Sequence, residues 1–478
     1  MPKTIEIKLP PEFAQDENAI KEKAAIESDI RIEDITHVQI LRKSLDARKR
    51  KNIVFQLRLN VYKKGEEVVS PLSNFTFNDE KKERTCHIVG LGPAGIFAAL
   101  QCLELGIKPI VLERGKSVEE RIKDISAIHK KKVIDKNSNY CFGEGGAGTY
   151  SDGKLYTRSK KRGSVQKVLG TFIQHGADEN IGYEAHPHIG TNKLPKIVAS
   201  MRKTILDNGG EIHFDTQVTD FVLKNDEIQN IICADGKEYD CQNVILATGH
   251  SARDIFELLD KKNIDIEAKS FALGVRIEHA QSLIDQLQYK QERGKHLPPS
   301  SYSLVTQAFG RGVFSFCMCP GGVIAPAATD SNEIVVNGWS SSARNGHFSN
   351  SGLVVEIRPE NWQEYAKDGA LAALSFQKNI EQDVYQATQS LEAPAQRVED
   401  FIQGRVSRDL LRTSYQPGLQ SHDLREVLPD FVADSLRQGL IDFGKKMRGY
   451  RTNDAQIVAV ESRSSSPIRI PRERDTLR

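Results

Sequence analysis

The chain of 478 residues lacks long apolar segments and has no excess of charge of one sign. No stretch approaches the ~18 consecutive apolar residues of a transmembrane helix, so such a helix is excluded. Its 66 lysines and arginines are matched by 64 aspartates and glutamates, which leaves a formal net charge of +2. This balance gives no general attraction to nucleic acids or membranes, and we expect neither as a partner. The first residues, MPKTIEIKLPPEF, also lack the pattern of a secretory signal.

Cysteines are few and odd in number, seven in all, which argues against a disulfide framework. Cys86 and Cys233 fall in strand patterns and Cys102 in a helical pattern, as buried reduced thiols do. We therefore expect a cytoplasmic protein with free thiols. Cys317 and Cys319 stand close together, but two sulfurs fall short of the about four ligands of a zinc site. No metal is expected.

The strongest pattern in the chain lies in residues 86–114. The apolar run 86–89 predicts a buried parallel strand that leads directly into the string GLGPAG at 90–95. A helix is expected over 93–105, and a second strand over 108–112. Strand, glycine-rich turn, helix and strand in this order are typical of a dinucleotide-binding unit. The alternative is a glycine-rich turn without a ligand.

Each residue of this turn has an expected task. Gly90 permits the tight turn, Gly92 presents no Cβ to a phosphate, and Gly95 lets the helix pack against the strand. Pro93 suits the first helical position, because its φ is preset and that position needs no amide hydrogen. Glu113 follows Gly95 by 18 residues, where a carboxylate can accept hydrogen bonds from a ribose. The helix N-terminus offers free amides to a pyrophosphate.

A second string of the same form, GEGGAG from Gly143, follows no apolar strand, so it is not a second fingerprint. It belongs instead to a glycine-rich loop, residues 139–155, which is suited to close approach of backbone to a ligand. The alternative is an ordinary surface loop. Because no second fingerprint is visible, any nicotinamide nucleotide would have to dock directly over another cofactor.

Further along, strands are expected at 211–222, 228–233 and 237–241, joined by turns into an antiparallel meander. Residues 244–247 then return to the parallel sheet and lead into Thr248-Gly249. This order points to FAD rather than NAD as the dinucleotide. By analogy with the fold, the backbone of Val218 would meet the adenine. The residues expected to contact FAD are Gly90, Gly92, Pro93, Ala94, Gly95, Glu113, Arg114, Gly145, Gly146, Asp152, Lys154, Val218, Ala247, Thr248 and Gly249.

The expected fold class is α/β, with several domains. Residues 1–80 predict a small α+β domain, and 84–255 a Rossmann-like FAD-binding domain with the antiparallel meander. Residues 256–415 are expected to form an inserted α+β substrate domain. Residues 416–478 would return to the FAD-binding domain.

Cys317 and Cys319 also suggest a redox-active disulfide. Two residues apart on a straight strand are separated by about 6.6 Å, near the upper limit for a bridge. A disulfide would need a bent backbone, which the following Pro320-Gly-Gly provides only in part. Structural or substrate-pocket cysteines are therefore favoured over redox-active ones, and both interpretations stay open.

Several other polar residues are candidates for the reaction. Arg276, Arg344 and His347 lie in the inserted domain, which must present polar groups to the cofactor; surface ion pairs are the alternative for each. We count Arg276 and Arg344 with the two cysteines as candidate catalytic residues. His186 and His188 flank a proline, and loop packing is favoured over acid–base chemistry.

The stretch 42–51 is basic and could contact the phosphates of a nucleotide or nucleic acid, although a solvated hairpin tip is the favoured interpretation. The main hypothesis is a redox enzyme with a small-molecule substrate, and two alternative functions remain. One is a flavin-dependent RNA-associated protein, and the other is a flavin-binding protein without catalysis.

Eight strings along the chain together resemble a bacterial family of uncharacterised FAD-dependent, or NAD(FAD)-utilising, dehydrogenases. They are KSLDAR from Lys43, GLGPAG from Gly90, FGEGGAGT from Phe142, SDGKL from Ser151, HPHIGT from His186, CMCPGG from Cys317, NGWS from Asn337 and ESRSSSPIRI from Glu461. The resemblance implies a glutathione-reductase-like FAD domain, an inserted substrate domain and a small N-terminal domain. It implies electron transfer through the flavin, with NAD(P)H as a candidate donor, and no known substrate.

One departure from that family concerns the C-terminus. The resemblance leads us to expect a further glycine-rich segment after the SSPIRI string, one that would close over the flavin. This sequence stops before such a segment. The expectation is reduced retention of FAD, and purified protein carrying one flavin per chain would contradict it.

Overall fold

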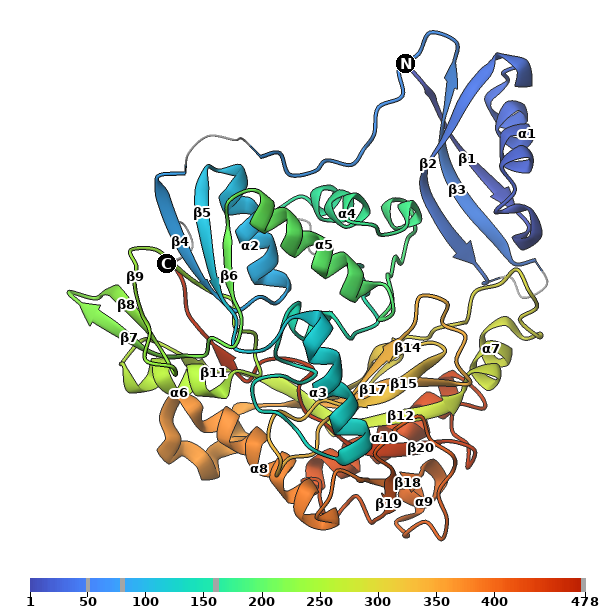
Figure 1. Cartoon of the computed structure of the whole chain (residues 1–478). Helices are drawn as coiled ribbons and strands as arrows, with labels where there is room; N and C mark the ends of the chain where they lie inside the picture. The colour runs from blue at the N-terminus through green and yellow to red at the C-terminus, as the bar shows by residue number, and fades with distance from the viewer. Residues whose placement is uncertain (49–51, 78–81, 158–162, 474–478) are drawn as a thin grey trace.

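The computed structural model describes residues 1–48, 52–77, 82–157 and 163–473. The N-terminal part is a three-stranded antiparallel sheet in the order β1-β3-β2, covered by one helix, and it stands to one side of the molecule (Figure 1). Its elements are β1 (Lys3–Leu9), α1 (Glu17–Ser28), β2 (Ile35–Asp46) and β3 (Val54–Lys63). Asp16 caps α1 by accepting from the amides of Asn18 and Ala19, which explains where that helix begins.

The second unit is a four-stranded parallel sheet in the order β10-β4-β5-β6, as expected for an α/β nucleotide-binding fold. Its strands are β4 (Arg84–Val89), β5 (Ile107–Leu112), β6 (Glu211–His213) and β10 (Val244–Leu246). Its helices are α2 (Pro93–Glu104), α3 (Val118–Lys131), α4 (Val165–Gln174), α5 (Leu194–Asp207) and α6 (Arg253–Lys261). The antiparallel meander is β7 (Val218–Lys224), β8 (Glu227–Cys233) and β9 (Glu238–Asp240). The meander and the return strand are present, but the single strand predicted over 211–222 is two strands, of which β6 joins the parallel sheet and β7 begins the meander.

The third unit is a seven-stranded, mostly antiparallel sheet in the order β13-β14-β17-β12-β20-β18-β19. Its strands are β12 (Phe271–Ala280), β13 (Val305–Ala308), β14 (Arg311–Cys319), β17 (Phe348–Ile357), β18 (Ala393–Arg397), β19 (Leu419–Ser421) and β20 (Gln456–Glu461). Its helices are α7 (Gln281–Tyr289), α8 (Ala372–Thr388), α9 (Val398–Gln403) and α10 (Asp430–Lys446). Two ribbons complete it, β15 (Gly322–Pro326) with β16 (Val336–Ser340), and β11 (Glu267–Ala268) with β21 (Ile468–Arg469).

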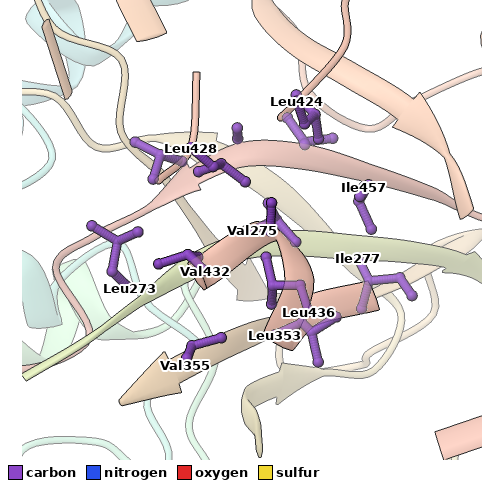
Figure 2. Packing of buried hydrophobic residues seen from close by; sticks show 14 of the residues in the cluster. Leu273, Val275, Ile277, Leu353, Val355, Leu424, Leu428, Val432, Leu436 and Ile457 are labelled. Atoms are coloured by element: carbon purple, nitrogen blue, oxygen red, sulfur yellow. The ribbon is translucent and has the colours of Figure 1, made fainter. Parts of the chain in front are cut away.

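The centre of this sheet is strand β12, nine of whose ten residues are buried. Leu273, Val275 and Ile277 alternate along it and belong to the same apolar core as Val432 and Leu436 of α10 (Figure 2). The residues between them point to the opposite face of the sheet. Strand β12 therefore holds Arg276 and Glu278 on the face away from this core. On that face Arg276 contacts Cys317 and Cys319.

The expected return of residues 416–478 to the FAD-binding domain holds for Ile468, which packs in one apolar core with Val89 and Leu112, but not for the strands before it. Strand β19 pairs with β18, and β20 pairs with β12 and β18, so both belong to the seven-stranded sheet. The domain boundary predicted between residues 415 and 416 therefore falls within the unit of the seven-stranded sheet. The prediction did not recognise β20 as a strand. Its residues QIVAVE are all buried and lie between β12 and β18 in the seven-stranded sheet. None of the helices in the described ranges is long and apolar enough to cross a membrane.

Candidate cofactor and redox site

A cavity of about 370 Å³ opens at the carboxyl edge of the parallel sheet. Val89 of β4 pairs with Leu112 of β5 on one side and with Leu246 of β10 on the other, so the chain leaves all three strands at one level. Of the residues predicted to contact FAD, the cavity is lined by Gly90, Gly92, Pro93, Ala94, Glu113, Arg114, Gly146, Val218, Ala247, Thr248 and Gly249. The edge of an open parallel sheet is where such folds bind ligands.

Two glycines of the turn are required by close packing. Gly90 has φ +102°, and a Cβ there would lie 2.6 Å from the carbonyl oxygen of Ala247. A Cβ at Gly95 would lie 1.9 Å from the carbonyl oxygen of Gly90. The tight turn and the close approach of helix to strand are therefore present as predicted. Gly95 makes that approach from behind the turn and does not line the cavity.

Gly92 differs, because space for a Cβ exists and the nearest atom would be 3.9 Å away. It is the N-cap of α2, with Pro93 as the first helical residue and, among the described residues, no side chain capping that end. The first-turn amides of a helix have no partner within the helix. An open cradle beside free amides fits a diphosphate, so the residues present suit the pyrophosphate of FAD.

Glu113 lies at the expected place and has a task that the sequence did not reveal. Its carboxylate is 4% exposed and accepts hydrogen bonds from three backbone amides, those of Leu91 at 2.7 Å, Gly115 at 2.9 Å and Gly143 at 3.0 Å. It thereby joins the glycine turn to the loop that begins at residue 139. A carboxylate accepts about four hydrogen bonds, so one position remains for a ribose hydroxyl.

Two more wall residues carry polar groups, Arg114, which was predicted, and His250, which was not. Arg114 lies over the Phe142 ring, 4.5 Å from its centre, and pairs with Asp254. His250 follows Gly249 on the wall, and its Nδ1 is buried without a hydrogen-bond partner among the described residues. Burial lowers the pKa of His250 to about 4, so the ring is neutral at physiological pH. A neutral imidazole with a free nitrogen suits a ligand that donates or accepts one hydrogen bond.

A second cavity of about 250 Å³ adjoins the first, because Cys141 and Ala147 line both. Asp152 and Lys154 line this cavity rather than the first one, together with Asn337, Gly338 and Trp339 from the opposite domain. Gly145 lines neither; it has φ +75°, and its amide donates to the carbonyl of Leu91 at 2.8 Å. The glycine-rich loop therefore forms the wall between the two cavities.

In the second cavity, one ammonium group contacts two sulfurs. Lys154 Nζ lies 3.6 Å from Cys317 Sγ and 3.5 Å from Cys319 Sγ, and 3.0 Å from a carboxylate oxygen of Asp152. Cys317 lines the cavity, whereas Cys319 is completely buried behind it. Both cysteines are free thiols. A cation that contacts two neighbouring sulfurs favours the thiolate form at one of them.

The backbone that carries these cysteines is bent. Strand β14 has a bulge between Phe316 and Cys319 in its pairing with β17, and Cys317 has φ +45°. A bulge changes the direction of side chains on the strand. The separation of about 6.6 Å expected for a straight strand therefore does not apply here. This removes the geometric objection to a close sulfur pair that the sequence raised.

Arg276 lies behind the cysteines and is completely buried. It donates to the carbonyl of Cys317 at 2.8 Å, contacts Cys319 Sγ at 3.5 Å, and pairs with Glu461 of β20 at 2.6 Å. Arg276 was predicted to contact a substrate. It cannot do so directly here, because its side chain lies inside the domain. It acts on the second cavity through the cysteines.

These contacts set the protonation of the pair. A hydrogen bond from the Cys319 thiol lowers the pKa of Cys317 well below its usual range, and Lys154 and Arg276 act in the same direction against burial. The same hydrogen bond and burial raise the pKa of Cys319. Of the two sulfurs, Cys317 is therefore the one whose surroundings favour the thiolate form.

Comparisons with known proteins decide the family. An uncharacterised protein of Clostridium beijerinckii is 37% identical in an alignment of 477 residues that covers 96% of this chain and 89% of that protein. Residues 270–464 match the model of a family described as FAD-dependent protein, C-terminal domain-like, and residues 1–62 match a domain of unknown function. The chain belongs to this family of uncharacterised FAD-dependent proteins. The family supports a flavin oxidoreductase with FAD as its cofactor.

Solved structures give only distant likenesses. The tetracycline destructase Tet(51) is 12% identical with a TM-score of 0.29, over 60% of this chain and 62% of that one. The Lactococcus lactis thioredoxin reductase is 17% identical with a TM-score of 0.20, over 35% of this chain and 36% of that one. This chain thus spans less than two thirds of either structure. Nothing about the reaction of the FAD-dependent family follows from these scores.

The other candidates, Arg344, His186, His188 and His347, line neither of these two cavities. Arg344 pairs with Asp152 and so orients the carboxylate that contacts Lys154. His188 hydrogen-bonds the carbonyl of Ser342, and the ring of His186 packs on Tyr156, so both are used in loop packing. The ring of His347 packs against Phe348. Lys154 therefore lines the second cavity itself, and Arg344 contacts Asp152, which also lines it.

Replacing Lys154 by methionine is expected to slow alkylation of Cys317 by iodoacetamide at pH 7 roughly tenfold, by removing the cation that favours its thiolate. The Coulomb energy of such a pair is about 4 kcal/mol at an effective dielectric of about 20, and solvent reaching Lys154 reduces the effect. The rate is measured by mass spectrometry of the peptide that contains Cys317. Lys154→Arg serves as the control and should retain most of the rate. Equal rates in Lys154→Met and the wild type would contradict a thiolate held by Lys154.

Proposed function

We propose that the protein is an FAD-dependent dehydrogenase that passes two electrons between its flavin and a small-molecule substrate. The observation that carries this proposal is the junction of the two cavities at Cys141 and Ala147. One cavity has the glycine turn and the open helix end for a nucleotide. The other has a charged group and two sulfurs, which suit redox chemistry. The adjoining positions suggest that one cofactor reaches from the first into the second.

In this proposal the first cavity holds the ADP part of FAD. The amides after Gly92 bind the diphosphate, Glu113 accepts from a ribose hydroxyl at its remaining position, and the backbone of Val218 meets the adenine. Ala247-Thr248-Gly249 lies on the wall between diphosphate and flavin. Ala147, which lines both cavities, would lie beside the flavin, and Lys154 in the second cavity would supply a positive charge near it.

The flavin, when bound, supplies two-electron redox chemistry, and the protein supplies orientation and electrostatics. Asp152 orients Lys154, Arg344 orients Asp152, and the apolar wall of Ala325 and Ala327 limits access of water to the second cavity. We propose NAD(P)H as a donor that docks over the flavin, since the sequence has no second dinucleotide fingerprint. Anaerobic mixing with NADH or NADPH, followed at the flavin absorbance, tests this donor.

Gly92→Ala is expected to weaken FAD binding about tenfold, equivalent to about 1.4 kcal/mol, without changing the stability of the fold. A Cβ here has room among protein atoms but enters the cradle of the diphosphate. FAD affinity is measured by titration of deflavinated protein, and stability by urea unfolding. Gly312→Ala on β14 is the matched control, because its Cβ would meet only side chains, the Phe314 ring at 3.3 Å and Gln307 Nε2 at 3.9 Å. Unchanged FAD affinity in Gly92→Ala would place the diphosphate elsewhere.

The two alternative functions gain no support from the described residues. In the basic stretch, Arg48 is held by Asp46 at 2.7 Å and Lys43 Nζ donates to the carbonyl of Ala14, while residues 49–51 lie outside the described ranges. A steep salt dependence of RNA binding would still favour the RNA-associated function. A flavin-binding protein without catalysis would be reoxidised without any preference among metabolites. Anaerobic photoreduction followed by a metabolite screen therefore separates it from an enzyme. Cytoplasmic location stays a prediction.

A further inference from the structure

We propose that Cys317 and Cys319 form a redox-active dithiol that cycles with a disulfide, and that the substrate of this site is a disulfide or dithiol compound. The link of this pair to the flavin rests on the proposed function, whereas the chemistry of the pair itself does not. The proposal goes beyond a general flavin oxidoreductase because it names the group that reacts and the class of substrate.

The first argument is geometric. Lys154 Nζ contacts both sulfurs within 3.6 Å, and the Cys319 thiol donates to the backbone carbonyl of Cys317 at 3.3 Å. The bulge in β14 and the left-handed backbone at Cys317 bend the strand so that neighbouring side chains face the same place. A disulfide needs two sulfurs that approach each other and Cα atoms within about 6.8 Å. The bent strand allows this approach, which a straight strand does not.

The second argument is the difference in access between the two cysteines. Cys317 lines the second cavity and can be reached by a molecule within it, whereas Cys319 is completely buried behind it. A reactive pair commonly has one accessible attacking sulfur and one sulfur that resolves the mixed disulfide. Cys317 is therefore the attacking residue and Cys319 the resolving residue.

The third argument comes from a second cysteine pair in the same protein. Cys86 and Cys102 belong to one apolar cluster under the parallel sheet, and the Cys86 thiol donates to the carbonyl of His87 at 3.8 Å. The Cys317–Cys319 pair instead has Lys154 and the buried Arg276 within 3.6 Å of its sulfurs. Among the described residues, two cations lie beside the sulfurs of Cys317 and Cys319, whereas no cation acts on Cys86 or Cys102, and this difference separates a reactive pair from a structural one.

The reaction balances with a disulfide as oxidant. The Cys317 thiolate attacks a sulfur of the disulfide R–S–S–R, forms a mixed disulfide and releases RS⁻. The Cys319 thiol then loses its proton to the released thiolate and attacks Cys317 Sγ, which forms the Cys317–Cys319 bond and releases a second RS⁻. In sum, one disulfide is reduced to RS⁻ and RSH, and one thiolate and one thiol of the protein are oxidised to a disulfide. The reverse sequence oxidises a dithiol.

The experiment uses the full-length protein as isolated. It is equilibrated with mixtures of reduced and oxidised dithiothreitol, its free thiols are blocked with N-ethylmaleimide, and the peptide with both cysteines is weighed. The expected result is a reversible loss of both blocked thiols in that peptide as the mixture becomes more oxidising. A peptide that stays fully blocked at every ratio overturns the proposal.

Variants assign the two roles. With oxidised glutathione, Cys319→Ser is expected to trap a mixed disulfide at Cys317, and Cys317→Ser to give none at Cys319. Cys86→Ser is the matched control and should cycle like the wild type. Adducts on both variants, or on neither, contradict the assigned roles, and the wild-type titration decides the proposal even where a variant fails to fold.

The flavin content is measured on the same samples from the absorbance of bound FAD, so the two proposals fail separately. Bound FAD with a pair that never oxidises overturns the dithiol and leaves the dehydrogenase. A pair that cycles in a protein that binds no FAD overturns the dehydrogenase and leaves the dithiol. When both hold, anaerobic addition of dithiothreitol should bleach the flavin in the wild type and at least tenfold more slowly in Cys317→Ser.

Discussion

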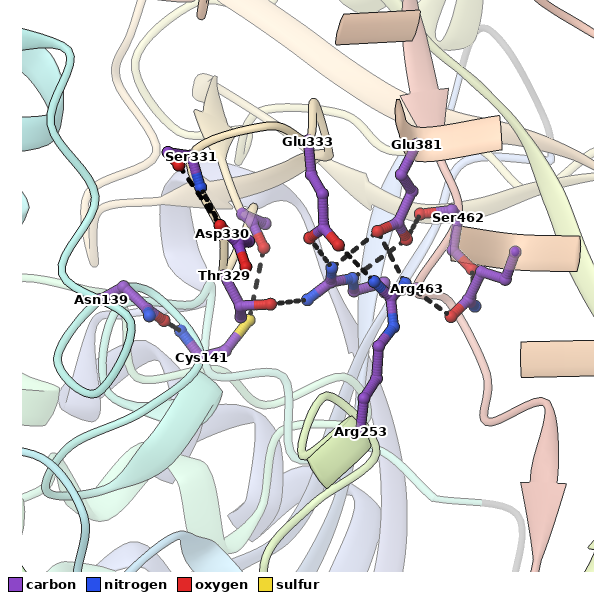
Figure 3. A network of polar contacts seen from close by, with 12 residues as sticks. Asn139, Cys141, Arg253, Thr329, Asp330, Ser331, Glu333, Glu381, Ser462 and Arg463 are labelled. Carbon is purple, nitrogen blue, oxygen red and sulfur yellow. Dashed lines mark hydrogen bonds and ion pairs between the residues drawn. The ribbon is translucent and has the colours of Figure 1, made fainter. Parts of the chain in front are cut away.

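Replacing Arg463 by methionine is expected to lower the free energy of unfolding by about 3–5 kcal/mol, the usual cost of removing one partner of a buried ion pair. Arg463 belongs to a buried cluster of two arginines and two glutamates, shown in Figure 3. It donates to Glu333 at 2.8 Å and to Glu381 at 2.7 Å. Arg253 of α6 binds the same two carboxylates. Without Arg463, two buried carboxylates share one arginine.

The cluster joins three parts of the chain that are distant in sequence. Arg253 comes from the helix after the parallel sheet, Glu381 from α8, and Arg463 from the segment after β20. Ser462 also donates to Glu381 at 2.5 Å, and Gln377 donates to the carbonyl of Ser462 at 2.8 Å. This cluster therefore fixes the parallel sheet against the unit of the seven-stranded sheet. It lies close to Cys141 and Ala327, which both line the second cavity.

The pH dependence of stability has a defined sign here. Burial favours the protonated form of Glu381, but Arg253 and Arg463 outweigh it and lower its pKa to about 2, from 4.5 when unfolded. A carboxylate with a lowered folded pKa stabilises the protein above its unfolded pKa. This contribution is lost as the pH falls from about 4.5 toward 2. Unfolding free energies across this range should therefore fall more steeply for the wild type than for Glu381→Gln.

Arg469→Met is the matched control for the arginine replacement. Arg469 pairs with Glu267 on the surface, with side chains 61% and 48% exposed, and its loss should change stability by less than about 1 kcal/mol. Urea unfolding followed by circular dichroism measures both variants. If Arg463→Met is as stable as Arg469→Met, the cluster does not hold the two domains together.

The nucleotide-binding half could be predicted from the sequence because its signals are local. The string from Gly90 to Gly95 fixes a turn, a helix start and a close helix–strand contact within six residues. The acid at 113 was also placed correctly, at the end of β5. Its three bonds to backbone amides could not be predicted, because one of them comes from Gly143, in a loop thirty residues away.

The second cavity could not be predicted because its groups come from distant strands. Lys154 and Cys317 are 163 residues apart, and Glu461 lies 185 residues from Arg276. The bulge in β14 also has no signal in the string CMCPGG, which reads as an extended strand followed by a turn. Strand β17 is hard to predict for a related reason, because FSNSGLVVEI begins with small polar residues and is buried on both faces.

Gly95→Ala is expected to weaken FAD binding about 100-fold, equivalent to about 2.8 kcal/mol, and to lower stability by roughly 1–3 kcal/mol. The added Cβ would lie 1.9 Å from the carbonyl oxygen of Gly90, a backbone atom that cannot move aside without moving the turn. Either α2 shifts away from β4 or the turn opens, and both change the direction of the first-turn amides. FAD titration and urea unfolding measure the two effects separately.

The comparison with Gly92→Ala makes this result specific. Both variants add one methyl group within the same turn, but the Cβ at Gly92 would have no protein atom closer than 3.9 Å. Gly92→Ala should therefore lose affinity through the ligand alone, whereas Gly95→Ala should lose affinity and stability together. A Gly95→Ala protein that binds FAD like the wild type would show that the cofactor does not depend on the alignment of α2 with β4. The proposed position of the diphosphate, at the N-terminus of that helix, would then be wrong.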